Sequence, residues 1–332
     1  MDSSSPDSRK LLEMANGFRA SCVLGAAAEL DLYTALGGQA MTAEEIAAKL
    51  SSDERAVRTL LDALAALGLL DKRQQTYAVP EPMRPLLVEG SSQTLLPMVR
   101  HMMCVLRSWA QLAAVVRSGK PAVRQASIRG AEADRAAFIA AMHSVSGPVA
   151  DELVGRLMPL EFDHLLDVGG ASGTWTLALL RAVPNAKATI FDLPDAIEQA
   201  RGRIGATQFA SRVRLVAGDF YADELPGGAD VAWVSAIAHQ HDRGHNRDLF
   251  GKVFRALTPG GGIGIRDLVM EPDRTRPVDG ALFAINMLVN TEAGGTFTFD
   301  EFRDDLHAAG FVDASVKVRS EDMNSVVLAR KP

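Results

Sequence analysis

The residues with the clearest chemical potential form a glycine-rich turn after a short apolar run. Residues 165–168 predict a strand, 169–173 read Gly-Gly-Ala-Ser-Gly, and 174–180 have the pattern of a helix. Glycine lets the backbone bend sharply and approach a ligand closely, beside the free N–H groups of a helix start. The dinucleotide fingerprint G-x-G-x-x-G fails whether it is started at Gly169 or at Gly170. A tight strand-to-helix turn without a ligand remains the alternative for this motif taken alone.

Acidic residues follow the next two predicted strands. Residues 188–191 lead to Asp192, and residues 213–217 lead through a glycine to Asp219 and Phe220. A carboxylate at a strand end can accept hydrogen bonds from ribose hydroxyls or an adenine amino group, and an aromatic ring can pack on the base. One such acid is explained equally well as a helix cap. The series of strand ends instead predicts a nucleoside site, because the carboxyl ends of parallel strands line one crevice.

A histidine-rich segment follows a fourth predicted strand, residues 229–235. It contains His239, His241, Asp242 and His245. Histidine can remove a proton from an acidic hydroxyl near neutral pH, which makes it a candidate general base. Helical spacing would place His241 and His245 on one face, but a metal site needs three or four converging ligands. We favour a solvated cluster at a helix start and predict no metal.

The elements that must position these residues change in character near residue 151. Beyond it, short β-rich runs alternate with helical patterns, which is typical of a parallel α/β sheet. Residues 96–157 before it have a helical pattern that Gly147-Pro148 interrupts.

The first hundred residues predict a winged helix. Helical patterns over residues 11–36 are followed by two capping boxes, Thr42 with Glu45 and Ser51 with Glu54, and a hairpin is expected over 69–79. Many winged helices bind DNA, yet this region has ten basic against thirteen acidic residues. Phosphate binding needs a concentrated positive face. We therefore expect packing or dimerisation rather than nucleic-acid binding.

Composition and charge limit the class of protein. The 332 residues are 47% hydrophobic and 23% charged, with a net charge of −6, and two domains suit this length. We expect neither a membrane helix nor a signal peptide, because no apolar run is long enough and the first ten residues are polar. Two cysteines suit a reducing compartment, so a cytoplasmic location is predicted.

The motifs together resemble the small-molecule O-methyltransferases that depend on S-adenosylmethionine. The similar segments are LLDVGGASG, FDLP at 191–194, GDF at 218–220 and LTPGGG at 257–262, with MANGFRA and AAAELDLYTAL in the first domain. The resemblance covers nearly the whole chain. It implies a Rossmann-like class I methyltransferase domain with a seven-stranded, mostly parallel sheet, preceded by a mainly helical winged-helix dimerisation domain.

The same resemblance implies domain limits and partners. We expect dimerisation through residues 1–95, a helical connector over 96–150 that contributes to the substrate pocket, and a cofactor domain over 151–332. The implied partners are S-adenosylmethionine (S-adenosylhomocysteine as product), a small-molecule acceptor and a second copy of the chain.

The resemblance also implies which residues bind the cofactor, catalyse the reaction and line the acceptor pocket. For the cofactor they are Gly169, Gly170, Asp192, Leu193, Asp219, Phe220 and Ser235. His239 is implied as the base and Asp267 as the acid that orients it, while His143, Met287 and Asn290 are candidates for the acceptor pocket.

The sequence departs from the family pattern at two places. Gln240 and His241 stand where many relatives have Asp and Trp, and the second acid expected after a Gly-Gly pair is replaced by Thr296 and Phe297.

The sequence therefore leaves three candidate functions. The first is transfer of a methyl group to a hydroxyl of an aromatic or polyketide-like molecule. The second is a non-methylating reaction on the same fold and cofactor, namely hydroxylation, decarboxylation or ring formation. The third, a winged-helix regulator, is disfavoured by the charge of the first domain.

Overall fold

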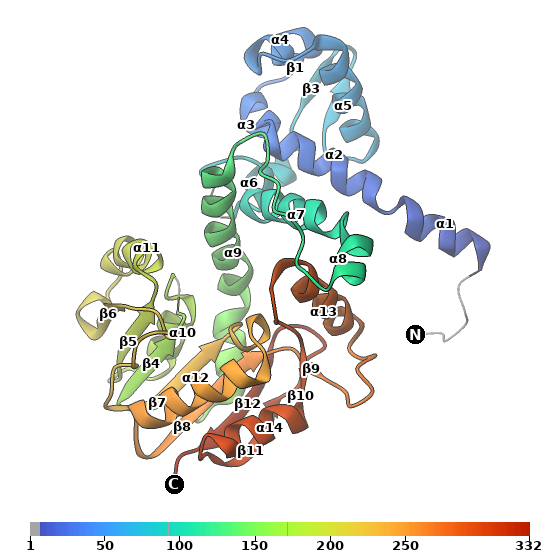
Figure 1. Ribbon diagram of the computed structural model, residues 1–332. Coiled ribbons are helices and arrows are strands. Elements are labelled where there is room, and N and C mark those ends of the chain that lie inside the picture. The colour runs from blue at the N-terminus through green and yellow to red at the C-terminus, as the bar shows by residue number, and fades with distance from the viewer. Residues whose placement is uncertain (1–6, 92, 171) are drawn as a thin grey trace. The chain divides into compact units, whose positions relative to one another are not determined.

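The computed structural model describes residues 7–91, 93–170 and 172–332, without the side chains of residues 139, 143–146 and 148. It divides into two compact units, one formed by residues 1–107 and 124–144 and the other by residues 108–123 and 145–332. Figure 1 labels their elements. Among the described residues, no helix is long and apolar enough to cross a bilayer.

The first unit is mainly helical with a small sheet, as a winged helix requires. Its elements are α1 (Ser8–Asn16), α2 (Phe18–Glu29), α3 (Leu32–Leu36), β1 (Met41–Thr42), α4 (Ala43–Lys49), α5 (Glu54–Ala66), β2 (Asp71–Arg73), β3 (Thr76–Ala78), η1 (Glu81–Met83), α6 (Arg84–Leu87), most of α7 (Leu96–Trp109) and the start of α9 (Ala131–Leu157). The expected hairpin is confirmed as β2 and β3, and β1 adds a third strand in the order β1-β3-β2. A buried apolar cluster that includes Tyr33, Leu61 and Tyr77 joins α2 to α6, β3 and the start of α7.

Of the two capping boxes predicted in this unit, one is confirmed and the other is wrong. The capping box of Thr42 and Glu45 is confirmed, since each side chain bonds the other's backbone N–H. The box at Ser51 is wrong: Asp53 caps α5 by accepting from the Ala56 N–H at 2.8 Å, while Ser51 takes a positive φ of 50°. Asp53 is the residue immediately before the helix, and aspartate is as good a cap as serine.

The predicted break at Gly147-Pro148 is also wrong, because α9 runs continuously from Ala131 to Leu157. A proline removes one N–H donor from a helix but keeps its own carbonyl as an acceptor. The neighbouring turns of a helix of 27 residues therefore continue on both sides of it.

The second unit is built on a seven-stranded sheet with the strand order β11-β12-β8-β7-β4-β5-β6. Its strands are β4 (His164–Val168), β5 (Lys187–Asp192), β6 (Val213–Ala217), β7 (Ala229–Ser235), β8 (Leu257–Asp267), β11 (Val312–Val318) and β12 (Ser325–Arg330). Only β12 pairs antiparallel, with β8 and β11, so the sheet is mostly parallel and the expected fold class is confirmed. A separate two-stranded ladder joins β9 (Val269–Met270) and β10 (Phe297–Thr298).

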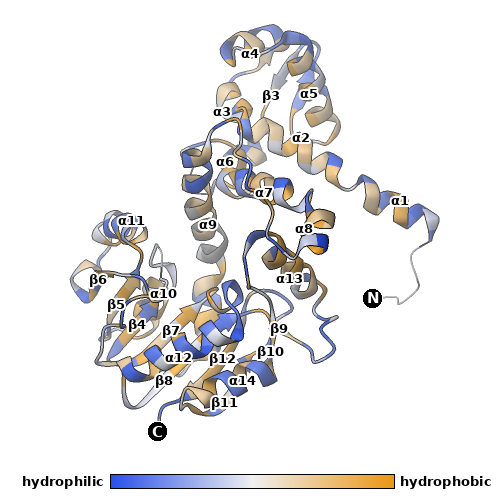
Figure 2. Ribbon diagram, in the orientation of Figure 1, coloured by the Kyte–Doolittle hydropathy of each residue, from blue (hydrophilic) through white to orange (hydrophobic). Residues whose placement is uncertain are grey.

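Helices cover both faces of this sheet (Figure 1). Besides the last turns of α9, the helices of this unit are α8 (Leu112–Ser118), α10 (Thr174–Ala182), α11 (Pro194–Gly205), η2 (Ala210–Arg212), η3 (Ala238–Gln240), α12 (Arg243–Ala256), α13 (Val278–Asn290) and α14 (Phe299–Ala308), of which α10, α11, α12 and α14 pack on the sheet. One buried cluster joins the sheet to α12 and α14, and another joins the opposite face to α10 and the last turns of α9. In Figure 2 the strands are mainly apolar and the outer face of α12 is polar. The crevice between β4 and β7, where the strand order reverses, is where open α/β sheets bind ligands.

Candidate active site

The glycine-rich turn after β4 is built so closely that side chains would not fit. Gly169 has a φ of 67°, and a Cβ there would lie 2.5 Å from the Ile237 side chain. A Cβ on Gly170 would lie 2.7 Å from the Asp167 carboxyl carbon. Burial raises the pKa of Asp167 to about 7, and its carboxyl accepts a hydrogen bond of 2.5 Å from Thr176. The turn therefore presents backbone rather than side chains to the crevice, as a site of close ligand approach requires.

The acids predicted at the strand ends lie where parallel strands place them. Asp192 ends β5, and its carboxylate accepts from the Leu193 N–H at 2.7 Å. Asp219 lies just beyond β6 and accepts from the Tyr221 N–H at 2.8 Å. A carboxylate is an acceptor that can take several hydrogen bonds, so both acids are of the type that a ligand's hydroxyl or amino group would bind.

Phe220 and its neighbours are fixed from α12. Lys252 donates to the carbonyl oxygens of Phe220 at 2.6 Å and of Tyr221 at 3.2 Å. The Phe220 ring lies 5.1 Å from that of Tyr221 and 5.7 Å from that of His241. An aromatic wall is therefore present at the end of β6.

The structure brings His239 and Asp267 together, although 28 residues separate them. His239 lies in η3 after β7 and Asp267 ends β8, the neighbouring strand. Nδ1 of the imidazole is 2.9 Å from Oδ1 of Asp267, and the backbone N–H of His239 donates to Oδ2 of the same carboxylate at 3.2 Å. Both side chains are buried, and Phe283 packs edge-on against the imidazole at 4.9 Å. A carboxylate on Nδ1 orients the ring and leaves Nε2 as the nitrogen that can take a proton.

His241 lies next to this pair but is not on a helical face with His245. It follows η3 in an extended conformation, and α12 begins only at Arg243, so the predicted helical spacing is wrong. Asp242 caps α12, which leaves His241 outside the helix. Tyr221 hydrogen-bonds Nδ1 of His241. Burial and the neighbouring imidazoles lower the pKa of His241 to about 4, so this ring is neutral in the physiological range.

The helix α13 presents polar and aromatic side chains together. Phe283 is three residues before Asn286, one helical turn away, so both lie on one face. Oδ1 of Asn286 accepts from Trp109 Nε1 and from Asn290 Nδ2, both at 3.0 Å. Met287 is buried and Asn290 is partly buried. The sequence gives no signal for the Trp109–Asn286 pair, because 177 residues separate the two side chains.

One predicted site residue falls outside the described side chains. His143 lies in α9, and its side chain falls outside the described set, as does the whole of Ala171 in the glycine-rich turn. Within residues 7–91, 93–170 and 172–332, no three His, Cys, Asp or Glu side chains converge as metal ligands would.

Comparison with known proteins decides the family. The O-methyltransferase domain matches residues 109–312, and the O-methyltransferase dimerisation domain matches residues 12–83. The chain belongs to the O-methyltransferase family. It is 32% identical to a tetracenomycin polyketide synthesis 8-O-methyltransferase of Streptomyces glaucescens, over 97% of this chain and 96% of the relative. It is also 31% identical to a 3-hydroxy-5-methyl-1-naphthoate 3-O-methyltransferase of Streptomyces sahachiroi, over 97% and 94% of the two chains.

A solved structure agrees with this assignment. Human N-acetylserotonin methyltransferase in complex with S-adenosylmethionine superposes with a TM-score of 0.83 at 27% identity, covering 100% of this chain and 99% of the human one. The family, the enzyme class and the use of S-adenosylmethionine expected from the sequence are thereby confirmed.

The described residues of this O-methyltransferase suit a nucleoside cofactor. The turn at Gly169 and Gly170 is a cradle that a Cβ would fill. Beside it are carboxylates at the ends of β5 and β6 and the aromatic ring of Phe220. These groups match the hydroxyls, amino group and flat base of an adenosine.

Proposed function

We propose that this O-methyltransferase transfers the methyl group of S-adenosylmethionine to a hydroxyl of an aromatic or polyketide-like small molecule. The observation that carries the proposal is the buried His239–Asp267 pair at the end of β7, with Nδ1 held 2.9 Å from the carboxylate. S-adenosylmethionine, when bound, supplies an electrophilic methyl group. The task of the chain is then to orient the acceptor and to remove its proton.

We propose His239 as the general base and Asp267 as its positioning residue. The Nδ1–H of the imidazole donates to the carboxylate, so Nε2 is left to accept the hydroxyl proton. As the imidazole takes that proton it becomes cationic, and the buried carboxylate beside it stabilises the new charge. The Phe283 ring limits the rotation of the imidazole.

The cofactor site in this proposal uses the crevice between β4 and β7. Its residues are Gly169, Gly170, Asp192, Leu193, Asp219, Phe220 and Ser235, all at or just beyond the ends of β4 to β7. The two carboxylates would accept from the ribose and the base, and Phe220 would pack on the base.

We propose that α13 forms one wall of the acceptor pocket. Phe283 and Met287 supply apolar surface, and Asn286 and Asn290 supply amides on the same helix. His143 is kept as a further candidate. The two Streptomyces relatives are named for polyketide and naphthoate substrates, which supports a flat, hydroxylated acceptor.

A panel of phenols tests this function. Purified protein with S-adenosylmethionine should form S-adenosylhomocysteine and an O-methylated product from at least one member. His239→Ala should lose at least about a hundredfold in kcat, as removal of a general base usually does. His307→Ala is the matched control, because His307 is an exposed histidine in α14. Full activity of His239→Ala would refute the proposed base.

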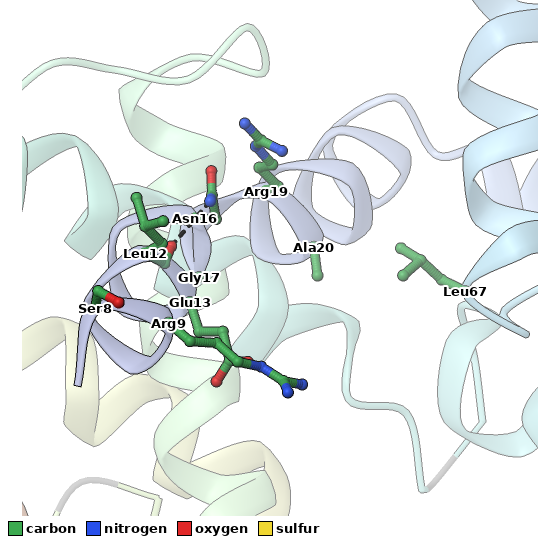
Figure 3. Close-up of a pocket in the computed structure, with 9 residues that line it drawn as sticks. All are labelled: Ser8, Arg9, Leu12, Glu13, Asn16, Gly17, Arg19, Ala20 and Leu67. Atoms are coloured by element: carbon green, nitrogen blue, oxygen red, sulfur yellow. Dashed lines mark hydrogen bonds and ion pairs between the residues drawn. The ribbon is translucent and has the colours of Figure 1, made fainter. Parts of the chain in front are cut away.

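We also propose a homodimer formed through the first unit. The match to the dimerisation domain supports it, and α1 and α2 expose Leu12, Met14 and Phe18 at 65%, 68% and 55%. Figure 3 shows Leu67 across open space from Ala20 of α2, and Leu12 of α1 is among the residues that line the same hollow. An apolar surface of this kind suits a protein partner.

Native mass spectrometry tests the dimer. Phe18→Glu should shift the protein toward monomer, while Met158→Glu, at an exposed apolar position in the other unit, should leave the dimer intact. A monomeric wild-type protein would refute the proposal.

The division into a dimerisation domain (1–95), a connector (96–150) and a cofactor domain (151–332) stays part of this proposal, as does a cytoplasmic location. Two free cysteines, Cys22 and Cys104, support the latter. We expect no nucleic-acid partner, because the chain is acidic overall.

The second candidate is a non-methylating reaction on the same fold and cofactor. It is favoured by the replacement of the family's second acid by Thr296 and Phe297, and by Gln240 and His241 in place of Asp and Trp. Product analysis separates the two, since only methyl transfer consumes the cofactor in step with product.

A further inference from the structure

A buried arginine lies beside the crevice without a carboxylate in contact. Arg266, in β8, is only 4% exposed. Its Nε and Nη2 donate to Oδ1 of Asn324 at 3.0 and 2.7 Å, and Nη1 donates to the Ser235 hydroxyl at 3.2 Å. Its guanidinium also lies over the Trp175 ring, 4.5 Å from the centroid. Across residues 7–91, 93–170 and 172–332, no Asp or Glu forms an ion pair with it.

Neutral partners leave most of this positive charge uncompensated. A buried charge is costly unless an opposite charge neutralises it. Burial lowers the pKa of Arg266 to about 10, although Asp267 and Asp322 act in the opposite direction. Asp267 is already bonded to His239, and Asp322 to Ser320 and Asn324. The site therefore favours an additional anion.

The position of Arg266 indicates which anion this is. Ser235 and Arg266 are direct neighbours in the β7–β8 ladder, and their side chains lie on the same face of the sheet. Ser235 is partly exposed at the carboxyl end of β7. Trp175, under the guanidinium, is the second residue of α10, the helix that begins at the glycine-rich turn. Arg266 thus reaches toward the crevice through Ser235.

A second arginine reinforces the positive potential at this helix start. Nη1 of Arg203 donates to the Ser172 carbonyl and hydroxyl at 3.2 and 2.9 Å, and to the Thr174 hydroxyl at 2.8 Å. Like Arg266, it forms no ion pair with any described Asp or Glu. Two guanidinium groups therefore contact residues at the start of α10, where the positive end of this nine-residue helix lies.

We propose that Arg266, acting through Ser235, forms the subsite for the amino-acid carboxylate of the cofactor. Arg266 donates to the Ser235 oxygen, so the serine hydroxyl is free to donate its own proton to a carboxylate oxygen. The guanidinium behind it supplies the opposite charge, and a charge-assisted hydrogen bond is stronger than a neutral one. Arg266 is in this sense a positioning residue. The inference rests on the proposed use of this crevice by S-adenosylmethionine.

Two ligands that differ in the amino-acid group test the proposal. S-adenosylhomocysteine carries the carboxylate, and 5′-methylthioadenosine shares the adenosine and sulfur but lacks it. Isothermal titration of the full chain with each ligand should show that Arg266→Met weakens S-adenosylhomocysteine at least tenfold and 5′-methylthioadenosine less than twofold. Ser235→Ala should act in the same direction, and Arg266→Lys should retain part of the affinity.

The controls separate this inference from the function on which it rests. Arg214→Met removes an exposed arginine from β6 and should change neither affinity. If Arg266→Met does not fold, as thermal unfolding would show, Ser235→Ala decides. Equal weakening of both ligands would make Arg266 merely structural and overturn the proposal, as would unchanged binding of S-adenosylhomocysteine. A wild-type protein that binds neither ligand would instead refute the proposed function.

Discussion

Replacing Asp267 by asparagine tests how the active site holds its base. The substitution keeps the size of the side chain and removes its negative charge. In the wild type, both Oδ1 and Oδ2 of Asp267 lie within 3.1 Å of the imidazole Nδ1, and both side chains are buried. An amide in this position can present its NH2 group to Nδ1, which would favour the tautomer that carries its proton on Nε2.

The geometry sets the size of the effect. Two unit charges 2.9 Å apart attract by about 6 kcal/mol at an effective dielectric constant of about 20, which is an upper bound for a buried pair. Since about 1.4 kcal/mol corresponds to a tenfold change in rate, four powers of ten is the ceiling. We expect Asp267→Asn to lower kcat by about 10²- to 10⁴-fold. The KM for S-adenosylmethionine should change little.

Steady-state kinetics on a series of phenols provides the assay. Phenols that ionise readily need a base least, so the loss should shrink as the acidity of the acceptor rises. Asp304→Asn, an exposed carboxylate in α14, is the control and should leave kcat unchanged. A loss below about threefold in kcat, or a loss independent of phenol acidity, would refute the reasoning.

Three further perturbations probe the rest of the site. Gly170→Ala should lower the free energy of unfolding by about 1–3 kcal/mol in urea titrations and weaken cofactor binding, because the new methyl group would overlap Asp167. His241→Gln should reduce the loss of stability on acidification. The pKa of His241 is lowered from 6.5 to about 4 in the folded chain, so between these pH values the unfolded chain binds one more proton and the wild-type protein loses stability as the pH falls. Melting curves over a pH series would show the difference. Asn286→Leu should raise the KM for the acceptor and not for the cofactor, and should cost about 1 kcal/mol of stability because Trp109 loses a partly buried hydrogen-bond acceptor.

Each of these has a contradicting result, and the first two have a control variant. Gly155→Ala, within α9 and with nothing within 4 Å of the new methyl group, should not lower the stability, and a stable Gly170→Ala would contradict the overlap. His307→Gln should leave the acid profile unchanged, and an identical profile for His241→Gln would contradict its burial as a neutral ring. For Asn286→Leu, equal rises in both KM values would place the helix away from the acceptor.

Local patterns were sufficient for much of the fold. Strand-to-helix alternation predicted β4, β5, β6 and β7 within a residue of their observed bounds, because buried parallel strands are short apolar runs with sharp ends. The helix caps could be predicted only in part. Thr42 was correctly predicted to cap α4, whereas α5 is capped by Asp53 and not by Ser51. Both carry good capping side chains, and only the backbone path distinguishes them.

The site residues that directly follow a strand could be predicted from the sequence. His239 could be named from its place after a predicted strand, and Asp267 through the resemblance to the family; the neighbouring strands β7 and β8 bring the two together. The Trp109–Asn286 and Tyr221–His241 contacts could not, because they join elements whose distance in the sequence gives no signal. The departure at His241 was visible, but its tyrosine partner was not. Such pairs depend on packing, which only the folded chain specifies.

The central claim is methyl transfer to a hydroxyl, and isotope transfer tests it most directly. S-adenosylmethionine carrying a trideuterated methyl group would be incubated with the full chain and the phenol panel, followed by mass spectrometry and NMR of the products. We predict a product that gains one trideuteromethyl group on oxygen, with one S-adenosylhomocysteine formed per product. A transformed product without the label, with the cofactor unconsumed, would contradict it and assign the fold to non-methylating chemistry.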